Sequence, residues 1–484
     1  MDASKKQREP VAFKSLAELK RFIRPGVEFK TVSHANHADM VGLTRVVTTV
    51  QTVCFYSKIK DQPNSRFSTD NGRIAHPGRE NPMKILMINS VCGIKSTGRI
   101  CTDLALELAK QGHTAKIAYG RGEAPAQYAD ISRKIGTNLD VAVHGCLART
   151  FDASGYGSLI ATKRFLDWVR RYDPDVIHLH NIHGYYIHVP LLFDYLKASG
   201  KRVIWTLHDC WPFTGHCCHY TLCGCTRWKT GCSHCPQKGR YPASILLDRS
   251  SRNYAAKKEL FSGLDHLTLV TPSRWLADQV SDSFLGSYSV QVIPNGIDLS
   301  RFRYTPEPYS QDDLKGKKIV LGVASAWDEH KGLNAFLQIA DRLGEAYQVI
   351  LVGVSRRQVR HMPGNVIGVA HTNSIEELAM WYSRADVFVN TSVEETMGMT
   401  TVEAAACGAP VVSFDATALP EVTASLGGCV VETGNIEGLC RAIRQACGSR
   451  TAGSSSCVSA YARSAMLEKY LNLYNLITKR DISL

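Results

Sequence analysis

The sequence predicts an α/β protein of two domains, each a parallel sheet with helices packed against it. From residue 83 onwards, short apolar runs of strand length alternate with segments of helical periodicity, which is typical of βαβ units. The alternation is interrupted by a polar, turn-rich stretch at 305–316 and then resumes. Both observations fit two Rossmann-like domains that face each other across a cleft.

Composition and charge agree with a folded protein of this size. The chain has 484 residues, of which 44% are hydrophobic and 21% are charged, and this excludes extended disorder or a coiled coil as a global description. We see no apolar run of about 20 residues and no secretory signal, so we expect a cytoplasmic protein. Of the net charge of +13, +6 lies in residues 1–82. The remaining +7 suits anionic ligands such as nucleotide diphosphates, or an anionic membrane surface, and solvated surface charge is the alternative.

The first domain is expected at 83–304, after an N-terminal extension at 1–82 to which we assign no function. It opens with an apolar strand at 84–90, a glycine-containing loop, a helix over 99–112 and a second strand at 114–120. Further strands are expected at 175–180, 202–208, 266–273 and 290–295. Several of these strands end in polar residues, at the sheet edge where open α/β folds bind their ligands.

The second domain is expected at 305–458. Its strands are predicted at 317–325, 347–353, 365–370, 386–392 and 409–414, with helices at 331–343, 374–384, 399–407 and 435–447. The last segment, 459–484, carries an amphipathic pattern over 459–480. We expect this helix to pack back on the first domain.

The segment from Asn390 to Ala404 has the pattern of a strand, a turn and the start of a helix. Backbone N–H groups at a helix N-terminus favour anions, so a phosphate or a sugar hydroxyl suits this place. Glu395 lies in the loop and Glu403 inside the helix. Two carboxylates beside a diphosphate would repel it unless each accepted hydrogen bonds from hydroxyls, which indicates a sugar-bearing ligand. The alternative is a helix start with acidic residues that stabilise the helix dipole.

The spacing Glu395-x7-Glu403, followed by AlaAlaAlaCysGlyAlaProValVal, resembles the signature of the retaining nucleotide-sugar glycosyltransferases of family 4, which have the GT-B fold. The segment VIPNGID at 292–298 is similar to the segment that joins the two domains in that family, and the glycines and lysine within 322–332 also match. The resemblance covers roughly 83–480. It implies transfer of a hexosyl group, with retention, from a nucleotide diphosphate sugar held by the second domain to an acceptor held by the first.

The same resemblance implies roles for individual residues. Glu395 would contact the donor sugar near the anomeric centre as a catalytic residue, Glu403 would bind the nucleotide ribose, and Lys331 would neutralise the diphosphate. The remaining donor-binding residues would be Gly98, Gly398, Met399 and Thr400. Such enzymes stabilise the leaving diphosphate without a catalytic divalent metal, so none is expected.

The sequence departs from the family pattern at Ala326, where the family usually has an arginine five residues before the lysine. The departure removes one charge-assisted contact to the diphosphate, worth about 1.5–3 kcal/mol. Trp327, His330 and the arginines at 356–357 are the candidate replacements, and the sequence does not decide among them.

The first domain contains histidines at the ends of two predicted strands. His208 is predicted to be catalytic, because a neutral imidazole near the junction of donor and acceptor can orient hydroxyls or accept a proton. His183 and Asp209 are predicted to lie on the acceptor side. The alternative is that these histidines alternate between the faces of a strand and are buried with satisfied hydrogen bonds.

Seven of the 16 cysteines lie between Cys210 and Cys235, a Cys-rich insert at 210–235. The spacing Cys232-x2-Cys235 is that of a metal knuckle, and Cys218 and Cys225 would complete a structural zinc site. His216, His219 and His234 are alternative ligands, and free thiols in a tight loop are the other reading. The insert resembles that of colanic-acid and capsule-type glycosyltransferases, which narrows the resemblance from family 4 as a whole to that subset.

These observations predict a glycosyltransferase of polysaccharide biosynthesis that acts on a glycan or lipid-linked acceptor. Peripheral contact with the inner face of the cytoplasmic membrane is expected, and a nucleic acid partner is not. A GT-B nucleotide-sugar epimerase is the alternative within the same fold, and the Glu395/Glu403 pair argues for transfer. A zinc-stabilised nucleic-acid-binding protein is the alternative from another class. It would need basic and aromatic residues interleaved along one surface, whereas the basic excess is concentrated in 1–82.

Overall fold

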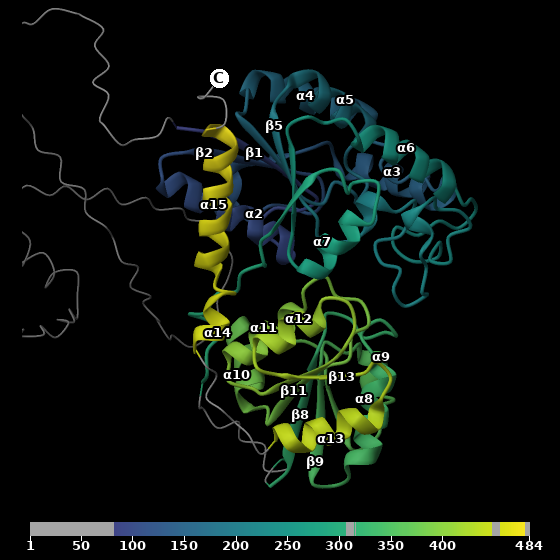
Figure 1. Ribbon diagram of the computed structural model, residues 1–484, viewed down its shortest axis with the longest axis vertical. Helices are drawn as coiled ribbons and strands as arrows, with labels where there is room; N and C mark the ends of the chain where they lie inside the picture. The colour runs from purple at the N-terminus through teal and green to yellow at the C-terminus, as the bar shows by residue number, and fades with distance from the viewer. Residues whose placement is uncertain (1–81, 306–313, 315, 448–454, 480–484) are drawn as a thin grey trace, which may run out of the picture. The chain divides into compact units, whose positions relative to one another are not determined.

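The computed structural model describes residues 82–305, 314, 316–447 and 455–479. Except for Pro82, the expected N-terminal extension lies outside the described residues. The described part contains two parallel sheets, one formed by residues before 293 and one by residues after 317, with helices packed against each (Figure 1). The predicted α/β fold class is confirmed. Among the described residues, none of the helices is both long enough and apolar enough to cross a membrane.

The first sheet has seven parallel strands in the order β3-β2-β1-β4-β5-β6-β7. Alternate residues of its central strand enter two different cores: Leu86 and Ile88 pack on one face, and Ile85 and Met87 on the other. A strand covered on both faces reads as a continuous apolar run, which is why it was recognisable in the sequence. The strands are β1 (Lys84–Asn89), β2 (Thr114–Tyr119), β3 (Ser132–Lys134), β4 (Val176–Leu179), β5 (Arg202–Thr206), β6 (Leu267–Thr271) and β7 (Ser289–Val292).

Within the described residues, six α-helices accompany the first sheet. They are α2 (Lys95–Lys110), α3 (Asn138–Phe151), α4 (Leu159–Tyr172), α5 (Val189–Ser199), α6 (Ser250–Phe261) and α7 (Arg274–Ser281). The sequence analysis predicted only α2 among them. It placed the start of α2 at residue 99, whereas the helix begins at Lys95.

The second sheet has six parallel strands in the order β10-β9-β8-β11-β12-β13. Its strands are β8 (Lys318–Val323), β9 (Tyr347–Val352), β10 (Val366–Val369), β11 (Val387–Asn390), β12 (Val411–Phe414) and β13 (Cys429–Val431). Its helices are α8 (Leu333–Leu343), α9 (Arg356–Val359), α10 (Ile375–Arg384), α11 (Met399–Ala406), α12 (Leu419–Ser425) and α13 (Ile436–Ala446). In both sheets the strand order reverses beside the first strand, so the carboxyl ends of neighbouring strands open a ligand crevice there.

The chain ends, within the described part, with α14 (Ser455–Ser459) and α15 (Arg463–Lys479). Helix α15 lies along the first half of the structure beside α2 (Figure 1). Its Tyr474 hydroxyl is 2.6 Å from Nδ1 of the buried His178, and its Tyr470 hydroxyl is 2.9 Å from the Thr206 hydroxyl. Burial lowers the pKa of His178 to about 3, so this imidazole is a neutral hydrogen-bonding group that anchors α15.

Candidate active site

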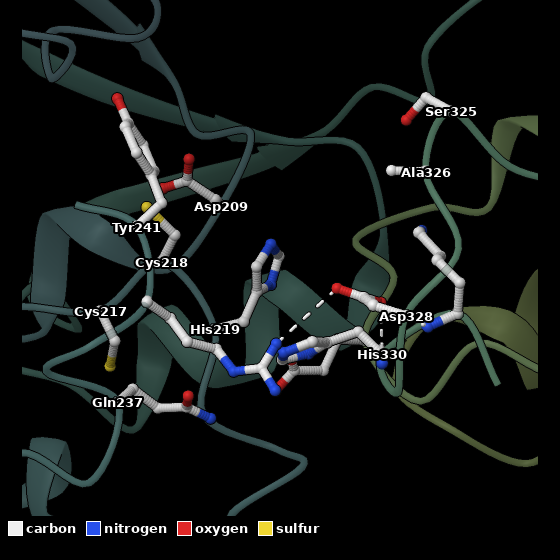
Figure 2. A pocket seen from close by; sticks show the side chains of 13 residues that line it. Asp209, Cys217, Cys218, His219, Gln237, Tyr241, Ser325, Ala326, Asp328 and His330 are labelled. Carbon is white, nitrogen blue, oxygen red and sulfur yellow. Dashed lines mark hydrogen bonds and ion pairs between the residues drawn. The ribbon is translucent and has the colours of Figure 1, made fainter. Parts of the chain in front are cut away.

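A cavity of about 540 Å³ lies between the residues of the first sheet's half and those of the second. Figure 2 shows the two walls facing each other, with Asp209 and Tyr241 on one side and Ser325 and Ala326 on the other. Lys331 also lines the cavity from the second half. Residues more than a hundred positions apart therefore meet around one space, which is large enough for part of a small ligand.

The second-half wall is built from the loop between β8 and α8. The Asp328 carboxylate accepts hydrogen bonds from the backbone N–H groups of His330, at 2.9 Å, and Lys331, at 3.2 Å. The Thr391 hydroxyl at the end of β11 donates to the Lys331 carbonyl at 2.9 Å. These bonds hold the backbone of Lys331, whose ammonium forms an ion pair with Glu395. The structure therefore brings two predicted site residues together.

The loop from β11 to α11 depends on Gly398. This residue caps α11 with a φ of 79°, and a Cβ there would lie 2.7 Å from Cδ2 of Leu419. Any other residue would be strained in that backbone conformation and would clash with Leu419. The conformation exposes the N-terminal end of α11, where Met399 and Thr400 begin the helix. The predicted strand, turn and helix start are therefore present.

A second cavity, of about 390 Å³, is lined by Met399 and Glu403 of the second half and by Gly93 and Arg99 of the first. The Tyr382 hydroxyl donates a hydrogen bond of 3.0 Å to Glu403. Burial raises the pKa of Glu403 to about 7, although the hydrogen bond from Tyr382 and the charge of Arg99 act in the opposite direction. Glu403 is thus a carboxyl group that lines a cavity and whose charge changes near neutral pH.

On the first-half wall, His183 and Asp209 form a buried pair. Nε2 of His183 is 2.8 Å from Oδ2 of Asp209, and Nδ1 is 3.2 Å from the hydroxyl of Tyr241. Burial alone would raise the pKa of Asp209. The charge and the hydrogen bond of His183 are the largest of the opposing effects, which together lower this pKa to about 2. Asp209 is therefore an anion throughout the physiological range, and it lines the cavity together with Tyr241.

His208, predicted to be catalytic, is not among the residues that line either cavity. Its Nε2 lies 3.1 Å from Nδ1 of His180, and the two rings are stacked. Burial lowers the pKa of His208 to about 4, so the imidazole is neutral near pH 7. Its backbone carbonyl accepts a hydrogen bond of 3.1 Å from the hydroxyl of Thr396, which connects the two halves. A catalytic role for His208 stays a prediction.

Gly98 does not lie in the loop where the sequence analysis placed it. Because α2 begins at Lys95, Gly98 is inside the first turn of the helix and is buried. Its carbonyl accepts a hydrogen bond of 3.1 Å from the N–H of Gly93. Gly98 is not among the residues that line the second cavity, whereas Gly93 and Gly296 are.

Arg240 is a residue of the cavity wall that the sequence analysis missed. It follows the Cys-rich insert, and its guanidinium pairs with Glu329 at 3.1 Å and with Asp328 at 3.7 Å across the cavity. Of the replacements considered for Ala326, Trp327 is buried with its indole N–H bonded to the Val352 carbonyl at 2.8 Å, and His330 pairs with the buried Glu394. Arg240 and Ala326 line the same cavity.

The cysteines of the insert are arranged differently from the predicted set of four. Cys218 lies with His183 and Asp209, and the ligand atoms of these three buried residues are within 4.8 Å of one another. In the part of the chain that the structure describes, no such group of three forms among Cys218, Cys225, Cys232 and Cys235. Cys217 and Cys218 both line the cavity. Zinc binding by the insert, with Cys218 among its ligands, stays a prediction.

The thiol that contacts Cys235 is Cys217. Cys217 donates a hydrogen bond to Cys235, and this bond is the largest of the effects that set the pKa of Cys235 at about 7, below its usual value. The insert is anchored by Lys257 of α6, whose ammonium donates to the carbonyls of Trp211 at 2.7 Å and Thr214 at 3.0 Å. Burial lowers the pKa of Lys257 to about 7.

Comparison with protein families identifies the class of enzyme. Residues 97–301 match the model "Glycosyltransferase Family 4", and residues 317–448 match the model "Glycosyl transferases group 1". The two matches fall on the two halves that line the cavity. The two models together cover most of the chain, which is therefore a glycosyltransferase with the GT-B fold.

The chain is similar to known proteins over most of its length. It is 25% identical over 411 residues to the putative colanic acid biosynthesis glycosyl transferase WcaC of Escherichia coli K12, a match that covers 81% of this chain and 99% of the relative. Among solved structures, sucrose-phosphate synthase from Thermosynechococcus elongatus has a TM-score of 0.61 at 17% identity, covering 82% of this chain and 99% of that one. HepE from Anabaena in complex with UDP and glucose has a TM-score of 0.56 at 15% identity, covering 81% and 99%. These structural likenesses support the fold.

Proposed function

We propose that the enzyme transfers a hexosyl group from a nucleotide diphosphate sugar to a hydroxyl of a glycan or lipid-linked acceptor in polysaccharide assembly, with retention of the anomeric configuration. The observation that carries the proposal is the meeting of two cations around one cavity, Lys331 from the second half and Arg240 from the first. The similarity to WcaC supports a place in polysaccharide assembly, and the UDP and glucose in the HepE structure support the donor class.

In this proposal the donor extends along the loop from Glu395 to Glu403. The nucleoside occupies the cavity of about 390 Å³, where ribose hydroxyls donate hydrogen bonds to the ionised Glu403. The diphosphate passes the N-terminal amides of α11, at Met399 and Thr400, and reaches Lys331. Two cations and a helix N-terminus then offset the charge of the leaving diphosphate, which is the electrostatic stabilisation that transfer needs.

The acceptor in this proposal lies against the first-half wall. Asp209 and Tyr241 hydrogen-bond its hydroxyls, while Glu395 contacts the donor sugar beside the anomeric carbon. The bond from that carbon to the diphosphate oxygen breaks, and a bond to the acceptor oxygen forms on the same face of the sugar. The proton of the acceptor hydroxyl passes to the diphosphate oxygen, so the step requires no catalytic metal and no separate base.

The proposal is tested by a thermal stability screen of the full chain with UDP-, GDP- and CMP-sugars. A donor at about 100 times its Kd stabilises the folded protein by about 2.7 kcal/mol. The donor found in this way is then incubated with a lipid-linked acceptor, and the anomeric configuration of the product is read by NMR. Absence of stabilisation by every nucleotide sugar contradicts the donor assignment, and release of an epimerised nucleotide sugar without acceptor indicates the epimerase instead.

A further inference from the structure

Three buried side chains meet on the first-half wall, and they offer a nitrogen, an oxygen and a sulfur atom. His183 follows β4, Asp209 follows β5, and Cys218 belongs to the Cys-rich insert. One ligand atom from each lies within 4.8 Å of the other two. Within the part of the chain that the structure describes, no other three histidines, cysteines or carboxylates come together in this way. The fold therefore brings three metal-ligand side chains from three segments to one point.

The chemistry of these three atoms fits a zinc ion. Proteins bind zinc through imidazole nitrogen, carboxylate oxygen and thiolate sulfur, usually in a tetrahedron whose ligand atoms are about 3.3–3.8 Å apart. This separation lies between the 2.8 Å from His183 to Asp209 and the 4.8 Å limit of the group. The carboxylate of Asp209 and a thiolate at Cys218 together neutralise the double charge of the ion, which makes its burial affordable. Thiolate and imidazole ligands also select zinc over magnesium or calcium.

Hydrogen bonds to their other polar atoms orient two of the three side chains. Nδ1 of His183 is 3.2 Å from the hydroxyl of Tyr241, so it can keep the hydrogen of the imidazole while Nε2 faces Asp209. Histidines that bind metals commonly use their second nitrogen in this way. Oδ1 of Asp209 accepts the N–H of Trp211 at 2.9 Å, which leaves Oδ2 directed at His183. The site therefore needs little reorganisation to take up an ion.

Without an ion, the same three groups are joined by hydrogen bonds. The imidazole of His183 and the thiol of Cys218 both contact the carboxylate of Asp209. A thiol is a weak hydrogen-bond donor, so the metal-free arrangement gains little from Cys218. A zinc ion would replace this weak bond by coordination to the thiolate. The metal-free and zinc-bound arrangements therefore exclude each other at this point of the wall.

We propose that His183, Asp209 and Cys218 bind an inhibitory zinc ion whose fourth position opens to the cavity of about 540 Å³. Asp209 and Cys218 line that cavity, and Figure 2 shows them next to each other on its wall. The ion occupies the carboxylate that, in the proposed function, hydrogen-bonds the acceptor hydroxyls. Zinc therefore competes with the acceptor, and transfer takes place in the metal-free state. This competition rests on the proposed function, whereas the binding of the ion does not.

The binding test is equilibrium dialysis of the full chain, freed of metal by EDTA, against Zn²⁺ or Mg²⁺. We expect the wall to take up one equivalent of zinc and no magnesium, and His183→Gln should remove that equivalent from the total. Cys232→Ser is the matched control, because it removes a predicted ligand of the insert and should leave the zinc of the wall in place. Tyr241→Phe should weaken zinc binding by about tenfold to a hundredfold, because His183 loses the hydrogen bond that orients it. The melting temperature of each metal-free variant shows that it is folded.

Absence of zinc binding by the wild-type chain overturns the proposal, and so does zinc binding that His183→Gln and Tyr241→Phe leave unchanged. Loss of zinc in Cys218→Ser and Cys232→Ser, but not in His183→Gln, overturns it by assigning the ion to the insert. In transfer assays zinc should raise the KM of the acceptor, and EDTA should reverse this effect. Zinc inhibition that is as strong in Tyr241→Phe as in the wild type contradicts competition at this site. The dialysis needs neither donor nor acceptor, so its failure is distinguishable from failure of the proposed function.

Discussion

Replacing Arg240 by alanine tests whether the first half contributes a cation to donor binding. Arg240 and Ala326 line one cavity, and Ala326 is exposed at the place where the family usually has an arginine. If Arg240 supplies the missing charge, Arg240→Ala weakens donor binding and Ala326→Arg in the same chain restores it. The exchange moves the guanidinium from one wall of the cavity to the other.

The expected magnitude follows from the exposure of the contacts. A charge-assisted hydrogen bond contributes about 1.5–3 kcal/mol, and the Arg240 side chain is 42% exposed, so the lower end applies. Arg240 must also leave Glu329, which is 69% exposed, and such a surface ion pair is worth about 0–1 kcal/mol. The net loss is about 1 kcal/mol, which corresponds to an increase of about fivefold in the Kd of the donor.

The assay is isothermal titration of the full chain with the nucleotide sugar that the stability screen identifies. Glu329→Gln is the control, because it frees the guanidinium without removing it. If Arg240 binds the donor, Glu329→Gln leaves the affinity unchanged or improves it. If Arg240 only holds the two halves together, Glu329→Gln weakens binding as much as Arg240→Ala does. An unchanged Kd in Arg240→Ala would refute the reasoning altogether.

Four further predictions concern the second half and the insert. Glu395→Gln should nearly abolish transfer but leave the donor Kd unchanged or lower, because it releases Lys331 from its ion pair; wild-type turnover would contradict the assignment. Donor affinity should fall as the pH drops through about 7 and Glu403 gains a proton, and the affinity of Glu403→Gln should stay the same across this range. Transfer should persist in EDTA, and a loss that Mg²⁺ restores would oppose the proposed diphosphate contacts. If the insert binds zinc, Cys217→Ser should lower the metal content and the melting temperature more than Cys218→Ser does. Equal losses would favour the ligand set predicted from the sequence, which includes Cys218.

Much of the fold could be predicted because buried parallel strands are visible as apolar runs. The runs around β1 and β11 were found within one or two residues of their ends. Helix α3 was missed for the opposite reason. It carries apolar residues on its exposed face as well as on its packed face, which weakens the helical periodicity.

Residues of the site could be predicted only where they belong to a motif of the family. Glu395 and Glu403 lie on one continuous segment, and the resemblance assigned Lys331 to the donor diphosphate before the structure showed its ion pair with Glu395. Arg240 has no such signal, because 89 positions separate it from Glu329 and its segment has no periodicity. Cys217 and Cys218 are adjacent in sequence, yet they take part in different contacts, with Cys235 and with Asp209. Spacing alone does not distinguish two neighbours whose side chains point different ways.

The contacts of the insert indicate why the two halves of the cavity depend on each other. The N–H of Leu222 donates to the buried Glu394 at 2.9 Å, and Arg240 reaches Glu329, so the insert and the residues that follow it contact two loops of the second half. Glu394 directly precedes Glu395, the proposed catalytic carboxylate. A change that loosens the insert therefore acts at the donor loop as well as at the acceptor wall. Variants of the insert should consequently alter the donor Kd even where their side chains are far from any donor atom.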